Sequence, residues 1–223
     1  MWFFYDYYYL VLVVPMLVFA LIAQVKVNTT FNKYSKKHTM RSVTGERAAR
    51  MILDQNGLFD VRIERVGGNL TDHYDPRTNV IRLSDGVYSS TSVAAVGVAA
   101  HEAGHAVQHA KGYIPIKLRA AVIPMTNIGS YLSIPLILIG LLFSGGIILA
   151  YIGVALFSLT AVFQLITLPV EFNASRRAIE ALRLSGSFAE NEISSSKKVL
   201  TTAALTYVAA HSDRKPVVYE ADE

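Results

Sequence analysis

The stretch TSVAAVGVAAHEAGHAVQH, residues 91–109, decides the fold because it combines a helix signal with a metal-binding motif. Thr91 and Ser92 offer side-chain oxygens that can cap a helix, and a run rich in Ala and Val follows them. Residues four apart lie on one face of a helix, so the imidazoles of His101 and His105 can bind one cation together. The stretch therefore predicts a helix that carries two metal ligands.

Glu102 lies between these histidines and completes an HExxH motif. Zn²⁺ suits imidazole ligands and lowers the pKa of a bound water from about 15.7 toward roughly 7. Glu102 projects to the side of the metal, where it can take a proton from that water and pass it to a leaving amine. Gly104 costs about 1 kcal/mol of helix stability relative to Ala, which indicates close packing around the site. The motif predicts hydrolysis that depends on one zinc ion, with Glu102 as general base.

The composition indicates a membrane protein. Hydrophobic residues make up 52% of the 223 residues, and the mean hydropathy of +0.35 is too high for an ordinary soluble domain. The 51 residues between Arg119 and Glu171 carry no formal charge, about twice the length that one transmembrane helix needs. A Ser-Gly-Gly turn signal at residues 144–146 divides them. A helical hairpin is therefore expected, with spans at residues 122–143 and 147–168.

A third span is expected near the N-terminus. An aromatic stretch at residues 2–9 precedes an apolar run at residues 10–25. Aromatic side chains favour the interface between water and lipid, so this start resembles the beginning of a transmembrane anchor. A cleaved signal peptide is the alternative. It is disfavoured because no basic segment precedes the run and because the run is longer than usual.

The distribution of Lys and Arg predicts the orientation of these spans. Basic residues follow the first span and flank the hairpin, whereas none precedes the first span or lies in the hairpin turn. Because basic flanks stay in the cytoplasm, the N-terminus is expected outside and the soluble segments inside. The chain then divides into a transmembrane anchor, a cytoplasmic part with the HExxH helix, the transmembrane hairpin and a second cytoplasmic part with C-terminal helices, at residues 1–27, 28–121, 122–168 and 169–223.

The charge and the lack of cysteine narrow the partners and the chemistry. A net charge of +4 and a pI near 9.2 fit cytoplasmic flanks that face anionic lipid headgroups. No aromatic and basic motif indicates nucleic-acid binding, so the expected partners are the lipid bilayer and a protein or peptide substrate. The absence of Cys excludes a thiolate metal site and a cysteine nucleophile.

The soluble part before the HExxH helix contains signals for one helix and two strands. A helix is expected at residues 44–53, with a C-terminal signal at Asn56 and Gly57. Alternation of apolar and charged residues predicts strands at residues 61–66 and 80–83. The second strand is a candidate edge on which an extended peptide substrate could pair, and a small hairpin that only covers the helix is the alternative. Its residues are Val80, Ile81, Arg82 and Leu83.

Glu171 is the predicted third zinc ligand. It is the first charged residue after the hairpin, which returns it to the side of the membrane that holds His101 and His105. A carboxylate there completes a site of three ligands with an open position for water, the arrangement of catalytic zinc sites. An interfacial charge, or a salt bridge to a neighbouring arginine, is the alternative role. Glu180 and Glu192 are weaker rivals.

Three blocks of sequence together resemble the YugP-like membrane zinc metallopeptidases. They are HEAGHAVQH at residues 101–109, DHYDP and VIRLS within residues 72–84, and PVEFNASRRA at residues 169–178. The likeness extends from about residue 44 to residue 210. More distantly, the order of HExxH, membrane hairpin and Glu-Phe-x-Ala helix is similar to the HtpX-like and CAAX-processing peptidases. The resemblance implies a gluzincin with ligands His101, His105 and Glu171 and the base Glu102.

Two departures from these relatives bear on the site. The wider group often has Asp where this chain has Ser175, and nearer relatives often have Asp where it has Asn173. Either carboxylate would orient a ligand histidine, so this support has to come from elsewhere in the chain. The apolar run at residues 199–210 continues in relatives, but its 12 residues here are too few to span a bilayer. A packed or interfacial helix is expected there.

The sequence thus predicts a mainly α-helical integral membrane protein with about three transmembrane helices and a small, helix-rich, zincin-like domain that includes a short β-hairpin or sheet. Its predicted function is that of a membrane-anchored zinc endopeptidase whose site faces the cytoplasm. His211, Tyr207 and Arg176 are candidates to stabilise the oxyanion of the reaction. The alternatives are a site-2-type intramembrane protease and a non-catalytic zinc-binding scaffold or adaptor.

Overall fold

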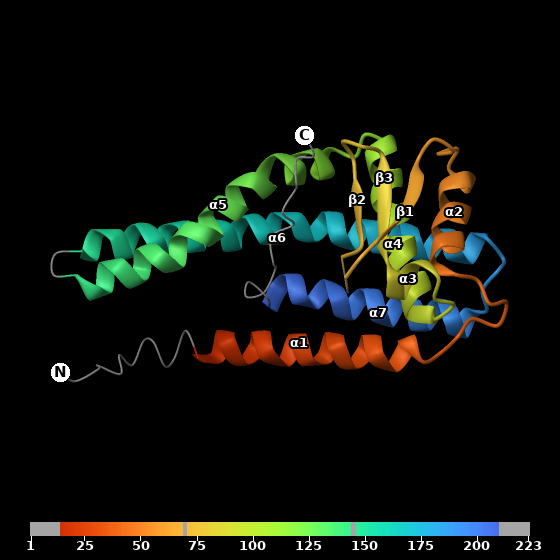
Figure 1. Ribbon diagram of the computed structural model, residues 1–223, viewed down its shortest axis with the longest axis horizontal. Helices are drawn as coiled ribbons and strands as arrows, with labels where there is room; N and C mark the ends of the chain where they lie inside the picture. Colours follow the sequence, from red (N-terminus) through yellow and green to blue (C-terminus); the bar gives the residue numbers. More distant parts are fainter. Residues whose placement is uncertain (1–13, 69–70, 144–145, 210–223) are drawn as a thin grey trace.

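The computed structural model of the chain describes residues 14–68, 71–143 and 146–209. The helices are α1 (Val14–Ser35), α2 (Gly45–Gln55), α3 (Asp85–Tyr88), α4 (Val93–Ala110), α5 (Ile114–Leu142), α6 (Ile147–Leu184) and α7 (Glu190–Ala209), and the strands are β1 (Arg62–Val66), β2 (His73–Asp75) and β3 (Val80–Ser84). The molecule is elongated: α5 and α6 extend as a hairpin from an end where the sheet, α2, α3 and α4 gather (Figure 1). The predicted mainly helical fold with a small sheet is confirmed.

The predicted helical hairpin is formed by α5 and α6, which lie side by side (Figure 1). A Cβ added to Gly153 of α6 would lie 2.6 Å from the backbone oxygen of Ser133 in α5, so glycine is needed for this close approach. Large apolar side chains cover the outside of the hairpin, including Leu141, Leu142, Ile148 and Tyr151. Such a surface matches lipid better than water. Residues 144–145 of the predicted turn lie outside the described residues.

Both helices of the hairpin are longer than the sequence predicted. Helix α5 begins at Ile114, so no break separates the cytoplasmic part from the span at residue 122. Helix α6 has 38 residues, about 57 Å, and runs through Pro169, so the span expected at residues 147–168 does not end there but continues as one helix past Glu171. The helix continues because its first part packs on α5 and its last part packs on α4 and α7. Helix α6 therefore connects the apolar hairpin to the domain with the HExxH motif.

Only part of the predicted membrane topology is met by the described residues. Among them, α5 is long and apolar enough to cross a membrane by length and composition, and residues 147–160 of α6 form a shorter apolar helix. The first part of the predicted N-terminal span, residues 10–13, lies outside the described residues. Helix α1 reaches Ser35, so the segment directly after that span is the continuation of a helix. The arrangement with three spans remains a prediction, and α5 is the one described helix whose length and composition suit a span.

The sheet has a different edge strand from the one that the sequence predicted, because β3 is its central strand. Its strand order is β1-β3-β2, with β1 parallel and β2 antiparallel to β3. The two predicted strands are confirmed as β1 and β3, whereas β2 was not predicted because its three residues are too few for an alternating pattern. Strand β3 lies between the other two, so the interpretation of Val80, Ile81, Arg82 and Leu83 as a free edge is wrong. The edge that contacts α4 belongs to β2.

Helix α4 is surrounded by the other elements of the domain. The Ser92 side chain accepts a hydrogen bond from the Ala95 N–H and so caps its N-terminus, as expected. Helix α2 is likewise capped by Thr44. Helices α2, α6 and α7 and strands β2 and β3 all pack against α4. The apolar run that begins at residue 199 forms the end of α7, so the expected helix is confirmed up to residue 209, and Val199, Leu200 and Ala204 within it are buried.

Candidate metal centre

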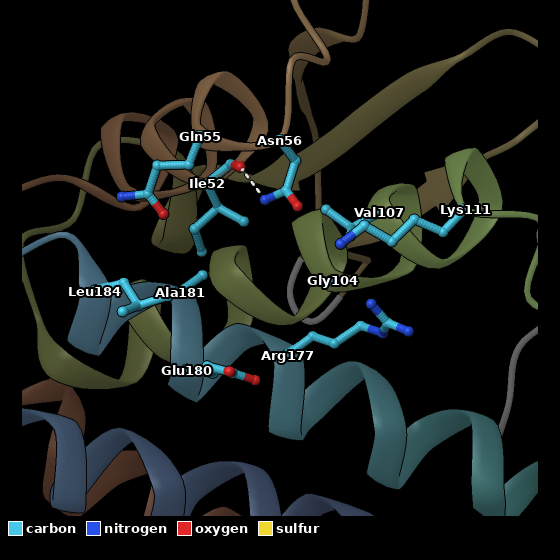
Figure 2. A pocket seen from close by; sticks show the side chains of 10 residues that line it. All are labelled: Ile52, Gln55, Asn56, Gly104, Val107, Lys111, Arg177, Glu180, Ala181 and Leu184. Atoms are coloured by element: carbon cyan, nitrogen blue, oxygen red, sulfur yellow. Dashed lines mark hydrogen bonds between the residues drawn. The ribbon is translucent and has the colours of Figure 1, made fainter.

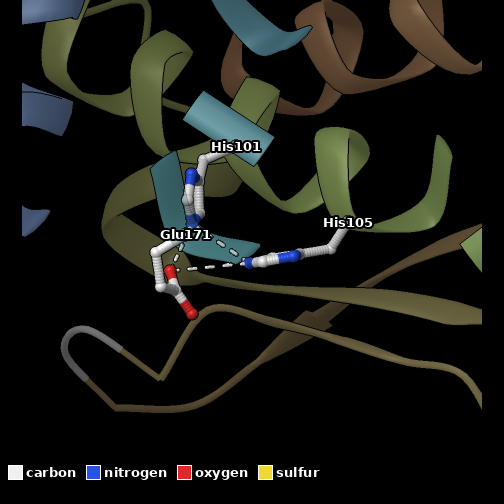
Figure 3. Close-up of side chains that lie close together, drawn as sticks. All are labelled: His101, His105 and Glu171. Carbon is white, nitrogen blue, oxygen red and sulfur yellow. Dashed lines mark hydrogen bonds and ion pairs between the residues drawn. The ribbon is translucent and has the colours of Figure 1, made fainter. Parts of the chain in front are cut away.

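Three side chains from two helices converge at one point, as Figure 3 shows. His101 and His105 come from α4 and Glu171 comes from α6, and their candidate ligand atoms all lie within 4.8 Å of one another. The Nε2 atoms of the two histidines are 3.1 Å apart, and Oε2 of Glu171 lies 3.1 Å from Nε2 of His101 and 3.7 Å from Nε2 of His105. Ligand atoms at the corners of a tetrahedral zinc site are separated by about 3.3 Å. The donor set and its spacing therefore fit zinc.

Gly104 allows α6 to approach α4 closely enough for Glu171 to reach the histidines. A Cβ added at Gly104 would lie 2.6 Å from the backbone oxygen of Ala174. Ala174 is three residues after Glu171, so this contact is within one helical turn of the third ligand. The close packing that the glycine indicated in the sequence is therefore present.

Replacing Gly104 by Ala is expected to weaken zinc binding at least tenfold. The new methyl group meets backbone, which cannot turn aside, so α6 must move away and carry Glu171 from the histidines. Zinc content and zinc affinity of the purified protein measure this effect. Gly97→Ala is the matched control on the same helix, because its Cβ would meet Ser196 at an ordinary 3.4 Å. Equal zinc affinity in both variants would show that helix spacing does not control the site.

Each ligand histidine is oriented through its other ring nitrogen. Nδ1 of His101 lies 3.1 Å from Oγ of Ser175, and Nδ1 of His105 lies 3.0 Å from Oε1 of Gln108. A metal ion on Nε2 requires the proton on Nδ1, which then donates to these oxygens. Ser175 and Gln108 thus perform the orienting role for which the sequence lacked a carboxylate.

Gln108 is itself fixed on α6. Its side-chain amide donates to the backbone oxygen of Val170 and to Oδ1 of Asn173, both at 2.9 Å. Oδ1 of Asn173 also accepts a hydrogen bond of 2.7 Å from Nε of Arg177. Gln108 is fully buried, so these bonds are shielded from water. Asn173 therefore supports His105 indirectly, through the side chain of Gln108.

Glu102 is buried beside the ligands and is oriented by strand β2. Its Oε2 atom accepts a hydrogen bond of 2.9 Å from the backbone N–H of Tyr74. Burial raises the pKa of the Glu102 carboxyl, an effect that the nearby His101 and His105 oppose. A raised pKa suits a carboxylate that must accept a proton near neutral pH.

Glu171 is held as an anion inside the protein. Its side chain is 2% exposed, and Nη1 of Arg119 lies 2.7 Å from Oε1. Burial raises the pKa of this carboxyl, but the two histidines and Arg119 outweigh burial and hold its pKa well below the usual range. The contact with Arg119 is an ion pair, and Oε1 is a buried oxygen without a hydrogen-bond partner among the described residues. The other oxygen, Oε2, lies beside the two histidines, where a carboxylate ligand to their metal would be expected.

Among the described residues, no contact joins the other predicted site residues to the three clustered side chains. Arg176 is exposed on α6, Tyr207 lies near the end of α7 but its side chain is not among those described, and His211 lies outside the described residues. Glu192 accepts hydrogen bonds from the backbone N–H groups of Met40 and Ala189, both at 2.7 Å, at the start of α7. It therefore has a structural role, and among the carboxylates proposed as third ligand, Glu171 is the one that reaches the histidines.

A separate cavity of about 210 Å³ lies between α2, α4 and α6 (Figure 2). Its lining includes Lys111, Arg177 and the rival carboxylate Glu180, together with Gly104. The lining includes neither Glu102 nor any of the three candidate ligands. Glu180 thus lies away from the metal centre, and the cavity is not part of it.

Known proteins resemble this chain over most of its length. The model of a family described as "Putative neutral zinc metallopeptidase" matches residues 9–213, which include the candidate metal centre. A Bacillus subtilis (strain 168) protein named "Putative membrane protease YugP" is 49% identical over 188 residues, a match that covers 84% of this chain and 83% of that protein. No solved structure matches the chain. The relative's name and the apolar helix α5 together support membrane association. The chain therefore belongs to the YugP-like family of zinc metallopeptidases.

Proposed function

We propose that the chain is a membrane-anchored, zinc-dependent endopeptidase of the gluzincin type. His101, His105 and Glu171 would hold one zinc ion, and Glu102 would act as the general base. The observation that carries this proposal is the convergence of three ligand atoms, from residues up to 70 positions apart, beside a buried glutamate. When bound, zinc would polarise the scissile carbonyl and make a water molecule more acidic.

Glu102 supplies the proton transfers of this reaction. The N–H of Tyr74 occupies Oε2, which orients the carboxylate and leaves Oε1 as the proton acceptor. Oε1 takes a proton as the water oxygen bonds to the carbonyl carbon, and the proton then passes to the amine nitrogen as the C–N bond breaks. Burial raises the pKa of Glu102, which makes its carboxylate a stronger base for taking the proton of the water.

Strand β2 offers a place for an extended peptide substrate. Its Tyr74 is paired with Ile81 of β3, yet the Tyr74 N–H bonds to Glu102 and thus points away from β3. Main-chain groups on this edge therefore face the candidate metal centre. A substrate strand that pairs with this edge would have its backbone fixed beside Glu102, and the selection of alternate side chains would set specificity.

The proposed site lies close to the proposed membrane surface. Arg119, in the second turn of α5, reaches Glu171, and the apolar part of α5 follows directly. If α5 crosses the bilayer, the site lies at the end of that span, on the side with the basic flanks. Membrane proteins with segments exposed to the cytoplasm are therefore the proposed substrates, together with free peptides.

Chelation tests the proposed function. The detergent-purified chain is expected to contain about one zinc ion and to cleave an unstructured protein or quenched fluorescent peptides. Removal of zinc by 1,10-phenanthroline is expected to abolish cleavage, and return of one equivalent should restore it. Elemental analysis before and after chelation is the control. Cleavage that persists in protein shown to be free of zinc would contradict the proposal.

A further inference from the structure

We propose that Arg119 is a catalytic residue whose guanidinium stabilises the oxyanion of the scissile peptide bond. This inference rests on the proposed function and adds to it a group that neither the HExxH motif nor the three ligands supply. The role was expected for His211, Tyr207 or Arg176; of these, Arg176 is the one whose side chain is described, and it is exposed. Arg119 comes instead from α5, the helix that forms one half of the apolar hairpin.

The position of Arg119 is the first argument. Its Nη1 atom lies 2.7 Å from Oε1 of Glu171 and 3.4 Å from Nε2 of His105. Oε1 is the carboxylate oxygen that is not shared with the histidines, since the contacts to His101 and His105 are made by Oε2. The guanidinium therefore contacts two of the three candidate ligands.

The unused donors of Arg119 are the second argument. A guanidinium has five N–H donors in a rigid fork, and the contacts with Glu171 and His105 involve Nη1 alone. Nε and Nη2 bond to no group among residues 14–68, 71–143 and 146–209. The side chain is 19% exposed, so these donors keep limited access to solvent beside the site. They are available for an oxygen that gains charge during the reaction.

The charge of the site is the third argument. Glu102 and Glu171 place two carboxyl groups around the scissile bond. As the water oxygen bonds to the carbonyl carbon, Glu102 takes the water proton and becomes neutral, while the π electrons of the carbonyl move to its oxygen. The negative charge thus moves from Glu102 to the carbonyl oxygen. Among the described residues, Arg119 is the Lys or Arg side chain that forms an ion pair with Glu171. It can therefore offset the new charge with a group that is already in place.

A purely structural role for Arg119 makes a different prediction. If the guanidinium served only to hold Glu171, its removal would disturb the third ligand, and zinc would be lost together with activity. An oxyanion donor is needed only as charge develops, so its removal should lower kcat while zinc and KM change little. Zinc content and the split between kcat and KM thus separate the two roles.

The experiment compares Arg119→Gln and Arg119→Lys with the parent and with Lys117→Gln. Lys117 is an exposed basic residue two positions earlier on α5 and is the matched control. Arg119→Gln is expected to keep about one zinc and to lose roughly 10²- to 10³-fold in kcat. Binding of a peptide phosphonamidate, which carries a tetrahedral anionic phosphorus, should weaken by a similar factor when measured by calorimetry. Binding of a peptide thiol, which mimics no oxyanion, should stay unchanged.

The other outcomes have distinct meanings. Arg119→Lys keeps the charge without the planar fork and is expected to lose less kcat than Arg119→Gln, which keeps the test valid if the glutamine variant folds poorly. Loss of zinc in both variants, or equal weakening of both inhibitors, would overturn the oxyanion role. Unchanged kcat in zinc-loaded Arg119→Gln would overturn it too. A parent protein that binds zinc but cleaves no peptide would overturn the proposed function, and the role of Arg119 would fall with it.

Discussion

Replacing Glu102 by Gln is expected to lower kcat for peptide hydrolysis by about 10²- to 10⁴-fold while the zinc content stays near one per chain. The amide cannot accept the proton of the attacking water, but its oxygen can still accept the hydrogen bond from the Tyr74 N–H. Glu102 is not one of the three clustered ligands, so the metal should remain. Steady-state kinetics with a quenched fluorescent peptide and elemental analysis of the same sample measure both effects.

A surface carboxylate provides the control for this variant. Glu64 on β1 has a side chain that is 40% exposed and pairs with Arg62 and Arg82, so Glu64→Gln should leave both kcat and zinc unchanged. Full activity in Glu102→Gln would contradict the general-base role. A parent protein that binds zinc but hydrolyses nothing, with or without Glu102, would instead favour the alternative of a non-catalytic zinc-binding scaffold.

The cluster of His101, His105 and Glu171 could be predicted because simple rules bring these residues together. His101 and His105 are four residues apart on a helix, so one turn brings them together whatever surrounds them. Glu171 could be predicted because a hairpin returns the chain to its starting side, and the first charge after the apolar run must then lie near the last charge before it. The same rule applies to Arg119, because it is the last charged residue before the apolar run. The ion pair between Arg119 and Glu171 could therefore have been predicted from the sequence, but Arg119 was used there only as the boundary of the apolar run.

The remaining parts of the site could not be read from sequence because they depend on packing between distant segments. Ser175 and Gln108 are common polar residues with no motif, and only the approach of α6 to α4 gives them a role beside the histidines. The edge at β2 rests on three residues that form a strand only because β3 pairs with them. Proline usually marks the start of a helix, yet α6 runs through Pro169. Packing of α6 against α5, α4 and α7 outweighs the loss of the one backbone hydrogen bond that proline removes.

Replacing Glu171 by Ala is expected to weaken zinc binding by more than about 100-fold, since even partners that only orient a ligand are worth 10- to 100-fold. The two histidines alone would leave the metal with two protein ligands, fewer than catalytic zinc sites use. Glu180→Ala is the matched control, because Glu180 lies nine positions further along α6 and lines the separate cavity. Zinc content after dialysis against a weak chelator measures the difference.

The two variants together distinguish the metal site from the chemistry. Glu171→Ala should lose both zinc and activity, whereas Glu102→Gln should lose activity alone, because only Glu171 reaches the histidines. Removal of Glu171 also leaves the largely buried Arg119 without its anion beside the two imidazoles. A cation in that position repels a metal ion, which adds to the loss of the ligand. Zinc that stays at the parental level in Glu171→Ala would therefore exclude Glu171 as a ligand, since two independent effects both predict its loss.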